Sequence, residues 1–266
     1  MIKRLISILL AVFSVFLFGC SDETVIDNTE TARDLNAYAE AVNKESRVDG
    51  EYFLSITFGE GAVLYHADGD IAWDIEAKTA YAEFGQTYLG DSSVMKNYIS
   101  GGKVISVDDG EKSESTRDEN ELFAKFPYAK ILLHDEKCGN ISISESAVGT
   151  AYEFTRTDTK EIFSRLIGED IFDLVFSIKN PQRDKTQYKD TKCVYTVKDG
   201  KIVSCRYEFD VKLFDTPAYI PNYEQPEEEY TIDLHISAKI TYNSFGDDVV
   251  IKEYTEESSD SSEESL

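Results

Sequence analysis

Histidine and cysteine are the side chains best suited to metal binding and nucleophilic catalysis, and this chain of 266 residues has three histidines and four cysteines. One short segment, residues 134–138, brings both types together in the order His-Asp-Glu-Lys-Cys. These residue types suit zinc, but their spacing corresponds to no known zinc frame. His66 and His235 stand apart from this segment, and the sequence has neither HExxH nor CxxC. We therefore predict no metal site and no cofactor.

Catalytic motifs built on other residues are also missing. There is no GxSxG nucleophile elbow, and the glycines at 59–61 and 101–102 are typical of turns rather than of phosphate-binding loops. With 51 acidic residues, carboxylate pairs arise by chance, so no pair indicates a glycosidase. The tyrosines at 219, 223 and 230 could stack on a sugar, but packing at the rim of a sheet is the simpler interpretation. We predict that the protein is not an enzyme.

Cys20 has a different chemical context, because it directly follows an export signal. Lys3 and Arg4 form a positive region, and residues 5–18 are apolar apart from two serines. This run fits the roughly 7–15 residues of a signal-peptide core and is shorter than the ~20 residues that span a bilayer. The segment ends Leu-Phe-Gly-Cys, which resembles the lipobox of bacterial lipoproteins, although Phe18 replaces the usual small residue.

The lipobox resemblance implies a modification and an address. Residues 1–19 would be the signal peptide, and Cys20 would be thioether-linked to diacylglycerol and become the new N-terminus. The protein would then be anchored by lipid at the outer face of the bacterial cytoplasmic membrane, in the cell envelope. The alternative is an ordinary secretory signal, or an uncleaved anchor, with Cys20 incidental.

The formal charge of −24 restricts the partners of the protein. A polyanion is bound through a basic face, so nucleic acid is excluded as a partner. An anionic body is also repelled by an anionic membrane surface, so the membrane is expected as a partner only through the lipid on Cys20. Residues 20–30 suit a polar tether. Residues 255–266 have almost no apolar side chain, and we expect this acidic tail to be disordered.

Between the tether and the tail, residues 31–254 are expected to form a single domain with few helices. A capping box at residues 31–34 opens a predicted helix that runs to about residue 46. A second helix is predicted from Asp158, with an apolar stripe at residues 162–167. A short helix near residues 118–125 is a further candidate, and residues 171–176 fit either a helix or a strand.

Strand signals dominate the domain. Apolar residues alternate with polar ones over residues 52–58, 71–77, 203–213 and 232–242, which is typical of an antiparallel sheet with one wet face and one covered face. Asp-Gly pairs predict turns between strands. These pairs stand at residues 49–50, 68–69, 109–110 and 199–200.

The hairpin around Asp199 and Gly200 also bears on two cysteines. Matching of the apolar faces favours a loop of three residues, 198–200, which would place Cys193 directly opposite Cys205 on the covered face. Export favours a disulfide between them. Buried reduced thiols that act as small apolar side chains are the alternative.

A lipobox, a polar tether, an amphipathic helix and a long run of antiparallel strands together resemble the LolA/LppX-like lipoproteins. The resemblance implies an α+β, β-rich fold, in which one strongly curved antiparallel sheet forms an unclosed barrel and a few helices cover its concave face. It also implies that a lipid or other amphiphile binds between sheet and helices. The candidate lining residues are Leu35, Tyr38, Val42, Tyr207, Phe209, Val211, Leu234, Ile236 and Ile240.

Fold does not determine function, so a second hypothesis remains. The core could instead be filled by side chains, and the protein would then be a structural or interaction lipoprotein that meets another envelope protein. The volume inside the core distinguishes the two, since ligand pockets usually measure about 300–1,000 Å³.

Overall fold

The structure is a computed structural model, and it describes residues 24–25, 28–59, 61–119, 141–166, 185–215 and 230–255. The predictions for Cys20, for Cys138, for residues 171–176 and for the tail beyond residue 255 lie outside these ranges. Only residues 118–119 of the candidate helix near residues 118–125 lie inside them.

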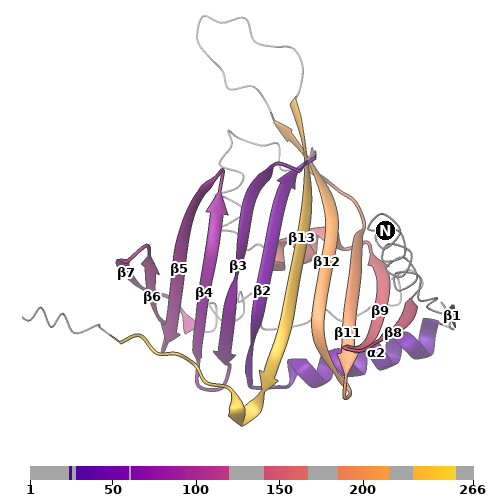
Figure 1. Ribbon diagram of the computed structural model, residues 1–266, viewed down its shortest axis with the longest axis horizontal. Coiled ribbons are helices and arrows are strands. Elements are labelled where there is room, and N and C mark those ends of the chain that lie inside the picture. Colours follow the sequence, from indigo (N-terminus) through magenta and orange to yellow (C-terminus); the bar gives the residue numbers. More distant parts are fainter. Residues whose placement is uncertain are drawn as a thin grey trace, which may run out of the picture.

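The described strands form one 13-stranded antiparallel sheet, which supports the predicted fold class (Figure 1). Its order is β1-β8-β9-β11-β12-β13-β2-β3-β4-β5-β6-β7, with β10 paired to β12. Because β1 and β7 lie at opposite ends of this order, the sheet is not closed. The strands are β1 (Thr24–Val25), β2 (Arg47–Phe58), β3 (Val63–Asp74), β4 (Thr79–Tyr88), β5 (Asp91–Ser100), β6 (Lys103–Asp108), β7 (Glu111–Thr116), β8 (Ser142–Ser146), β9 (Gly149–Arg156), β10 (Gln187–Tyr188), β11 (Thr191–Lys198), β12 (Lys201–Asp215) and β13 (Tyr230–Phe245).

Strand β13 illustrates how the sequence alternation becomes two faces. Leu234, Ile236 and Ala238 are buried. His235, which lies between the first two, and Lys239, which follows Ala238, are exposed. His235 faces solvent, and its Nδ1 lies 2.9 Å from Asp210 Oδ1. The buried residues form one core cluster on the inner face of the sheet.

Two helices pack against that inner face. Helix α2 (Asn28–Asn43) begins three residues before the predicted start and buries Leu35, Ala39 and Val42. Residues 159–166 form the second predicted helix, which buries Ile162 and other residues of its apolar stripe. Because β1 pairs with β8 and α2 begins at Asn28, the fold starts within the segment predicted as a tether.

Two of the four predicted Asp-Gly turns are confirmed. At 109–110 and 199–200 both residues have positive φ, as the tight turn between paired strands requires. The other two predictions are wrong, because Gly50 lies inside β2 and Gly69 inside β3. A side chain at Gly69 would collide with the carbonyl oxygen of Glu83 on β4, and one at Gly50 with that of Thr241 on β13. These glycines therefore permit a close approach of neighbouring strands.

The predicted register of the β11–β12 hairpin is also wrong. The loop has two residues, Asp199 and Gly200, and a bulge in β12 restores the match of apolar faces. The bulge turns Ile202 inward and leaves Val203 half-buried, the reverse of the expected alternation. Cys193 consequently lies opposite Tyr207, and Cys205 lies opposite Tyr195.

The chain leaves the sheet after β13. A short 3-10 turn, η2 (Gly246–Asp248), follows the strand, and Gly246 has a φ of 76°. Residues 249–255 then pass the lower ends of β3, β4 and β5 in Figure 1.

Candidate ligand-binding site

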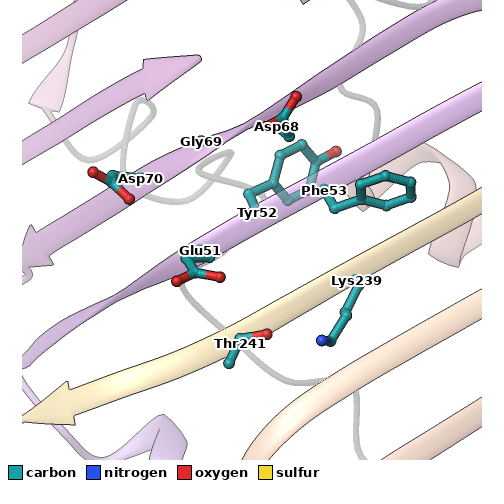
Figure 2. Close-up of a pocket in the computed structure, with 8 residues that line it drawn as sticks. All are labelled: Glu51, Tyr52, Phe53, Asp68, Gly69, Asp70, Lys239 and Thr241. Atoms are coloured by element: carbon teal, nitrogen blue, oxygen red, sulfur yellow. The ribbon is translucent and has the colours of Figure 1, made fainter. Parts of the chain in front are cut away.

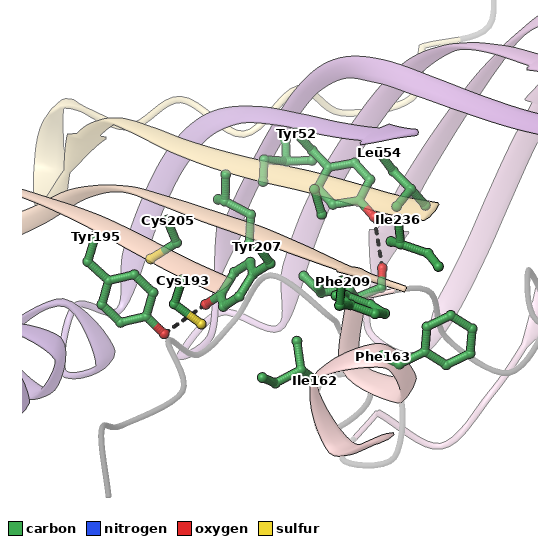
Figure 3. Packing of buried hydrophobic residues seen from close by; sticks show 14 of the residues in the cluster. Tyr52, Leu54, Ile162, Phe163, Cys193, Tyr195, Cys205, Tyr207, Phe209 and Ile236 are labelled. Carbon is green, nitrogen blue, oxygen red and sulfur yellow. Dashed lines mark hydrogen bonds between the residues drawn. The ribbon is translucent and has the colours of Figure 1, made fainter. Parts of the chain in front are cut away.

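The nine predicted lining residues belong to or pack against one core cluster between the helices and the sheet. Figure 3 labels three of them, Tyr207, Phe209 and Ile236. Phe209 pairs with Ile236 and Val211 with Leu234 across β12 and β13, so the two strands present one apolar face. Helix α2 lies against β12 on that face. The apolar residues of β12, β13 and α2 therefore lie on one side of the sheet. Their role in binding a ligand stays a prediction. Eight of the nine are buried and Tyr38 packs at the edge: Leu35, Tyr38, Val42, Tyr207, Phe209, Val211, Leu234, Ile236 and Ile240.

The helix at 159–166 contributes residues that the lining prediction omitted. Phe163 lies edge-on to Phe209, with ring centroids 5.8 Å apart, and 5.9 Å from the ring of Tyr188. The hydroxyl of Tyr52 donates a hydrogen bond of 2.8 Å to the carbonyl oxygen of Leu166, which ties the end of this helix to β2. The apolar stripe of the helix was the sequence signal that could have included Phe163.

Two groups of hydroxyls within the core form hydrogen bonds. The hydroxyls of Tyr195 and Tyr207 lie 3.0 Å apart (Figure 3). Thr191 donates to Thr159 at 2.8 Å, and Thr159 donates to the carbonyl oxygen of Lys189 at 2.7 Å. Burial raises the pKa of both tyrosines well above the usual value, so both stay neutral at physiological pH. These hydroxyl pairs therefore hold no charge, and the buried charged side chains of the described residues, Asp74 and Arg156, are each in an ion pair.

The two cysteines in the core are free thiols, and both have no exposed surface. The two cysteines are diagonal neighbours across the β11–β12 pair, so they lie farther apart than directly opposite residues would. A directly opposite pair would suit a disulfide better. Burial raises the pKa of the Cys205 thiol, which keeps it protonated. A protonated, inaccessible thiol is a poor nucleophile, so these cysteines pack as small apolar side chains.

Ion pairs, one of them formed by the buried Arg156, fix the ends of both covering helices. The Lys201 ammonium contacts the Glu45 carboxylate just beyond α2, and so links this end of the helix to β12. The Arg156 guanidinium contacts Asp158 directly before the second helix. The hydrogen bond from Arg156 lowers the pKa of Asp158, so the pair stays ionised at neutral pH. These contacts attach one end of each covering helix to the rest of the fold.

Two cavities in the described part of the chain lie away from the nine residues. One, of about 370 Å³, opens on the outer face beside Gly69, where Glu51, Asp68 and Asp70 surround it with Lys239 (Figure 2). The other, of about 660 Å³, is a shallow hollow beside the second helix. The described residues contain no group of three or more histidine, cysteine or acidic side chains placed to hold a metal.

Comparisons with known proteins bear on the fold. No family model and no curated protein matches the sequence. The lipoprotein LppX of Mycobacterium tuberculosis has a TM-score of 0.43 and 10% identity over 85% of this chain and 100% of its own. LprF from Mycobacterium bovis has a TM-score of 0.44 and 7% identity over 84% of this chain and 96% of its own.

A LolA superfamily protein from Nitrosomonas europaea has a TM-score of 0.27 and 5% identity, over 86% of this chain and 96% of its own. These likenesses concern the course of the chain alone. Within the described ranges, no helix combines the length and apolar character needed to cross a membrane.

Proposed function

We propose that the protein is a non-catalytic, lipid-anchored protein on the outer face of the bacterial cytoplasmic membrane, and that it binds a lipid or other amphiphile between the sheet and its helices. One observation carries the binding proposal. The inner face of an unclosed sheet is apolar, and α2 and the helix at 159–166 cover it. An apolar face under a separable cover is where an acyl chain gains most from leaving water.

The proposed anchor is diacylglycerol on Cys20, exposed when the signal peptide of residues 1–19 is removed. The proposed tether, residues 20–30, would link the lipid to the domain of residues 31–254 through β1 and the start of α2, which already belong to the fold. Residues 255–266 would remain as a solvated acidic tail. The lipid on Cys20 makes the membrane the first partner, and each buried CH₂ of its chains adds about 0.8 kcal/mol of membrane affinity.

The energetics of the cover limit how a ligand enters. Lifting α2 from the sheet uncovers Leu35, Ala39 and Val42, which are all buried. Each Leu- or Val-sized side chain loses about 1.5–3 kcal/mol when it is exposed. An acyl chain that takes the place of the helix on the inner face offsets this loss. Ligand entry is therefore expected to be coupled to displacement of α2.

A second candidate function is favoured by the packing of the same core. Leu35, Ile236 and Ala238 have no exposed surface, and neither cavity described above is lined by the predicted residues. A core filled in this way leaves no room for a ligand. The protein would then be a structural or interaction protein of the cell envelope that meets another protein through its outer face.

Substitution of Ala238 by leucine distinguishes the two functions. Ala238 points into the core on β13, and its neighbour Ser237 points outward. In a binding protein, Ala238→Leu occupies part of the inner face that the acyl chain would cover, so a fluorescent fatty-acyl probe that binds the wild type should bind the variant at least tenfold more weakly. Ser237→Leu is the matched control and should bind the probe as the wild type does.

A filled core predicts that the probe binds neither the wild type nor the variant. An added leucine in a packed core costs about 1–3 kcal/mol, so Tm of Ala238→Leu should fall by several degrees. Absence of probe binding to the wild-type protein together with this fall would rule out the binding function and leave the interaction function.

A further inference from the structure

The last described residues lie on the face of the sheet opposite to the core. We call residues 249–255 the strap. Its Lys252 contacts Tyr81 on β4, and the neighbours of Tyr81 in that strand, Ala80 and Ala82, belong to the core cluster. Since successive side chains of a strand point to opposite faces, the strap covers the outer face.

Two side chains of the strap, Lys252 and Tyr254, make its specific contacts. The Lys252 ammonium donates a hydrogen bond of 3.2 Å to the Tyr81 hydroxyl, lies 4.5 Å from the centre of that ring, and is 3.6 Å from a Glu83 oxygen. The ring of Tyr254 lies edge-on to Tyr98, with centroids 5.5 Å apart. Lys112 lies 4.5 Å above the same Tyr254 ring.

The backbone adds little to this attachment. Among the described residues, the only backbone hydrogen bond of the strap runs from Val249 N–H to Gly246 O within the preceding turn. Val250 is 78% exposed. Cation–π contacts and exposed ion pairs are individually weak. Val249 is buried, so the strap can leave the sheet from Val250 onward, and it does so without breaking a pair of strands, since β13 ends at Phe245.

The surface under the strap is suited to bind another chain. Tyr81 and Tyr98 pack together with ring centroids 5.2 Å apart, and only 3% of Tyr81 is exposed. Glu83, which also contacts Lys96 at 3.0 Å, offers a carboxylate, and Lys112 offers a cation. We call these four residues the outer aromatic surface. Detachment of the strap would expose an aromatic pair together with one acidic and one basic side chain, and aromatic side chains are enriched at protein interfaces.

We propose that the outer aromatic surface is a docking site for an extended segment of another protein that carries a basic and an aromatic residue two positions apart, and that the strap occupies this site until the partner displaces it. The seated strap shows the chemistry that the site accepts, a lysine against Tyr81 and Glu83 and a ring against Tyr98. A segment tethered in the same chain acts at about millimolar effective concentration, so it suppresses weak partners.

The test uses the full chain and a fluorescently labelled peptide of residues 249–255. The double variant Lys252→Ala/Tyr254→Ala opens the site and leaves the outer aromatic surface unchanged. The peptide should bind this opened chain at least tenfold more tightly than it binds the wild type, as measured by fluorescence anisotropy. Val250→Ala is the matched control, because this exposed strap residue should leave the site closed.

Two further variants locate the binding on the proposed surface. Adding Tyr98→Ala to the opened chain should weaken binding at least tenfold, and adding Lys112→Ala, at an exposed position, should weaken it severalfold with an unchanged melting temperature. A peptide with only Lys-Glu-Tyr in a Gly-Ser frame should bind the opened chain within tenfold of the native peptide. Equal binding to wild-type and opened chains, no binding to the opened chain, or failure of the framed peptide would overturn the proposal.

Discussion

Tyr65 shows how a single buried hydroxyl links this fold to pH. Its side chain packs within the core and donates a hydrogen bond of 3.3 Å to the Gln86 side-chain oxygen. Burial raises the pKa of Tyr65 from 10.0 to about 12, because the phenolate would lose its hydration inside the sheet. The unfolded chain therefore releases this proton at a lower pH than the folded protein does.

We predict that Tyr65 weakens the fold at alkaline pH. Between pH 10 and about 12 the unfolded state holds fewer protons, so the free energy of unfolding falls as pH rises, by about 2–3 kcal/mol from this residue. Below pH 10 this contribution is fully present. Tyr65→Phe should lose less stability across the same window, as measured by urea unfolding at several pH values. Equal alkaline losses in the two proteins would contradict the assignment.

The thiols of Cys193 and Cys205 allow a second prediction at this scale. Both are buried and free, so iodoacetamide should label neither in the native protein and both after denaturation, as read by peptide mass spectrometry. An unlabelled pair that becomes reactive only after reduction would instead show a disulfide and a different register of β11 and β12.

At the scale of single elements, glycines inside strands set how closely the strands approach. Gly69 lies in β3 and faces Phe84 across the β3–β4 pair. An added Cβ would meet the Glu83 carbonyl oxygen, a backbone atom that moves only when the strand moves. Gly85 in β4 has more room, since an added Cβ would lie 3.8 Å from the nearest atom, the Asp68 oxygen.

We predict that alanine is tolerated at Gly85 and not at Gly69. Gly69→Ala should destabilise the protein by about 1–3 kcal/mol, because the strands must move apart. Gly85→Ala should be neutral or should stabilise by up to about 1 kcal/mol, because alanine restricts the unfolded chain. Thermal unfolding of both variants is the measurement, and similar melting temperatures for the two would refute the steric explanation.

At the scale of the whole molecule, the question is how the acidic body is held in the envelope. The formal charge of −24 disfavours binding to anionic lipid surfaces. We predict that Cys20→Ala releases the protein from washed membranes, because alanine has no thiol to carry diacylglycerol and the apolar run before it is shorter than a bilayer. Ser21→Ala is the control and should stay membrane-bound. Retention of the Cys20 variant after carbonate washing would exclude the lipid anchor.

The sequence by itself determined the faces of the long elements. Alternation over residues 203–213 and 232–242 predicted an antiparallel sheet with one covered face, and the spacing of Leu35, Ala39 and Val42 predicted the covering helix. These predictions hold because burial of a side chain depends on a local period, which is two residues in a strand and 3.6 in a helix. A local period can be recognised without knowing the partner.

Only the tertiary structure decided features that depend on two segments at once. Asp-Gly at 68–69 has the same local signal as Asp-Gly at 199–200, yet the first lies within β3 because β4 approaches it closely. The bulge that turns Ile202 inward depends on pairing with β11. The strap contacts Tyr81 and Tyr98, which precede it by more than 150 residues along the chain. Steric and side-chain contacts between such distant segments have no period along the sequence, so local patterns do not encode them.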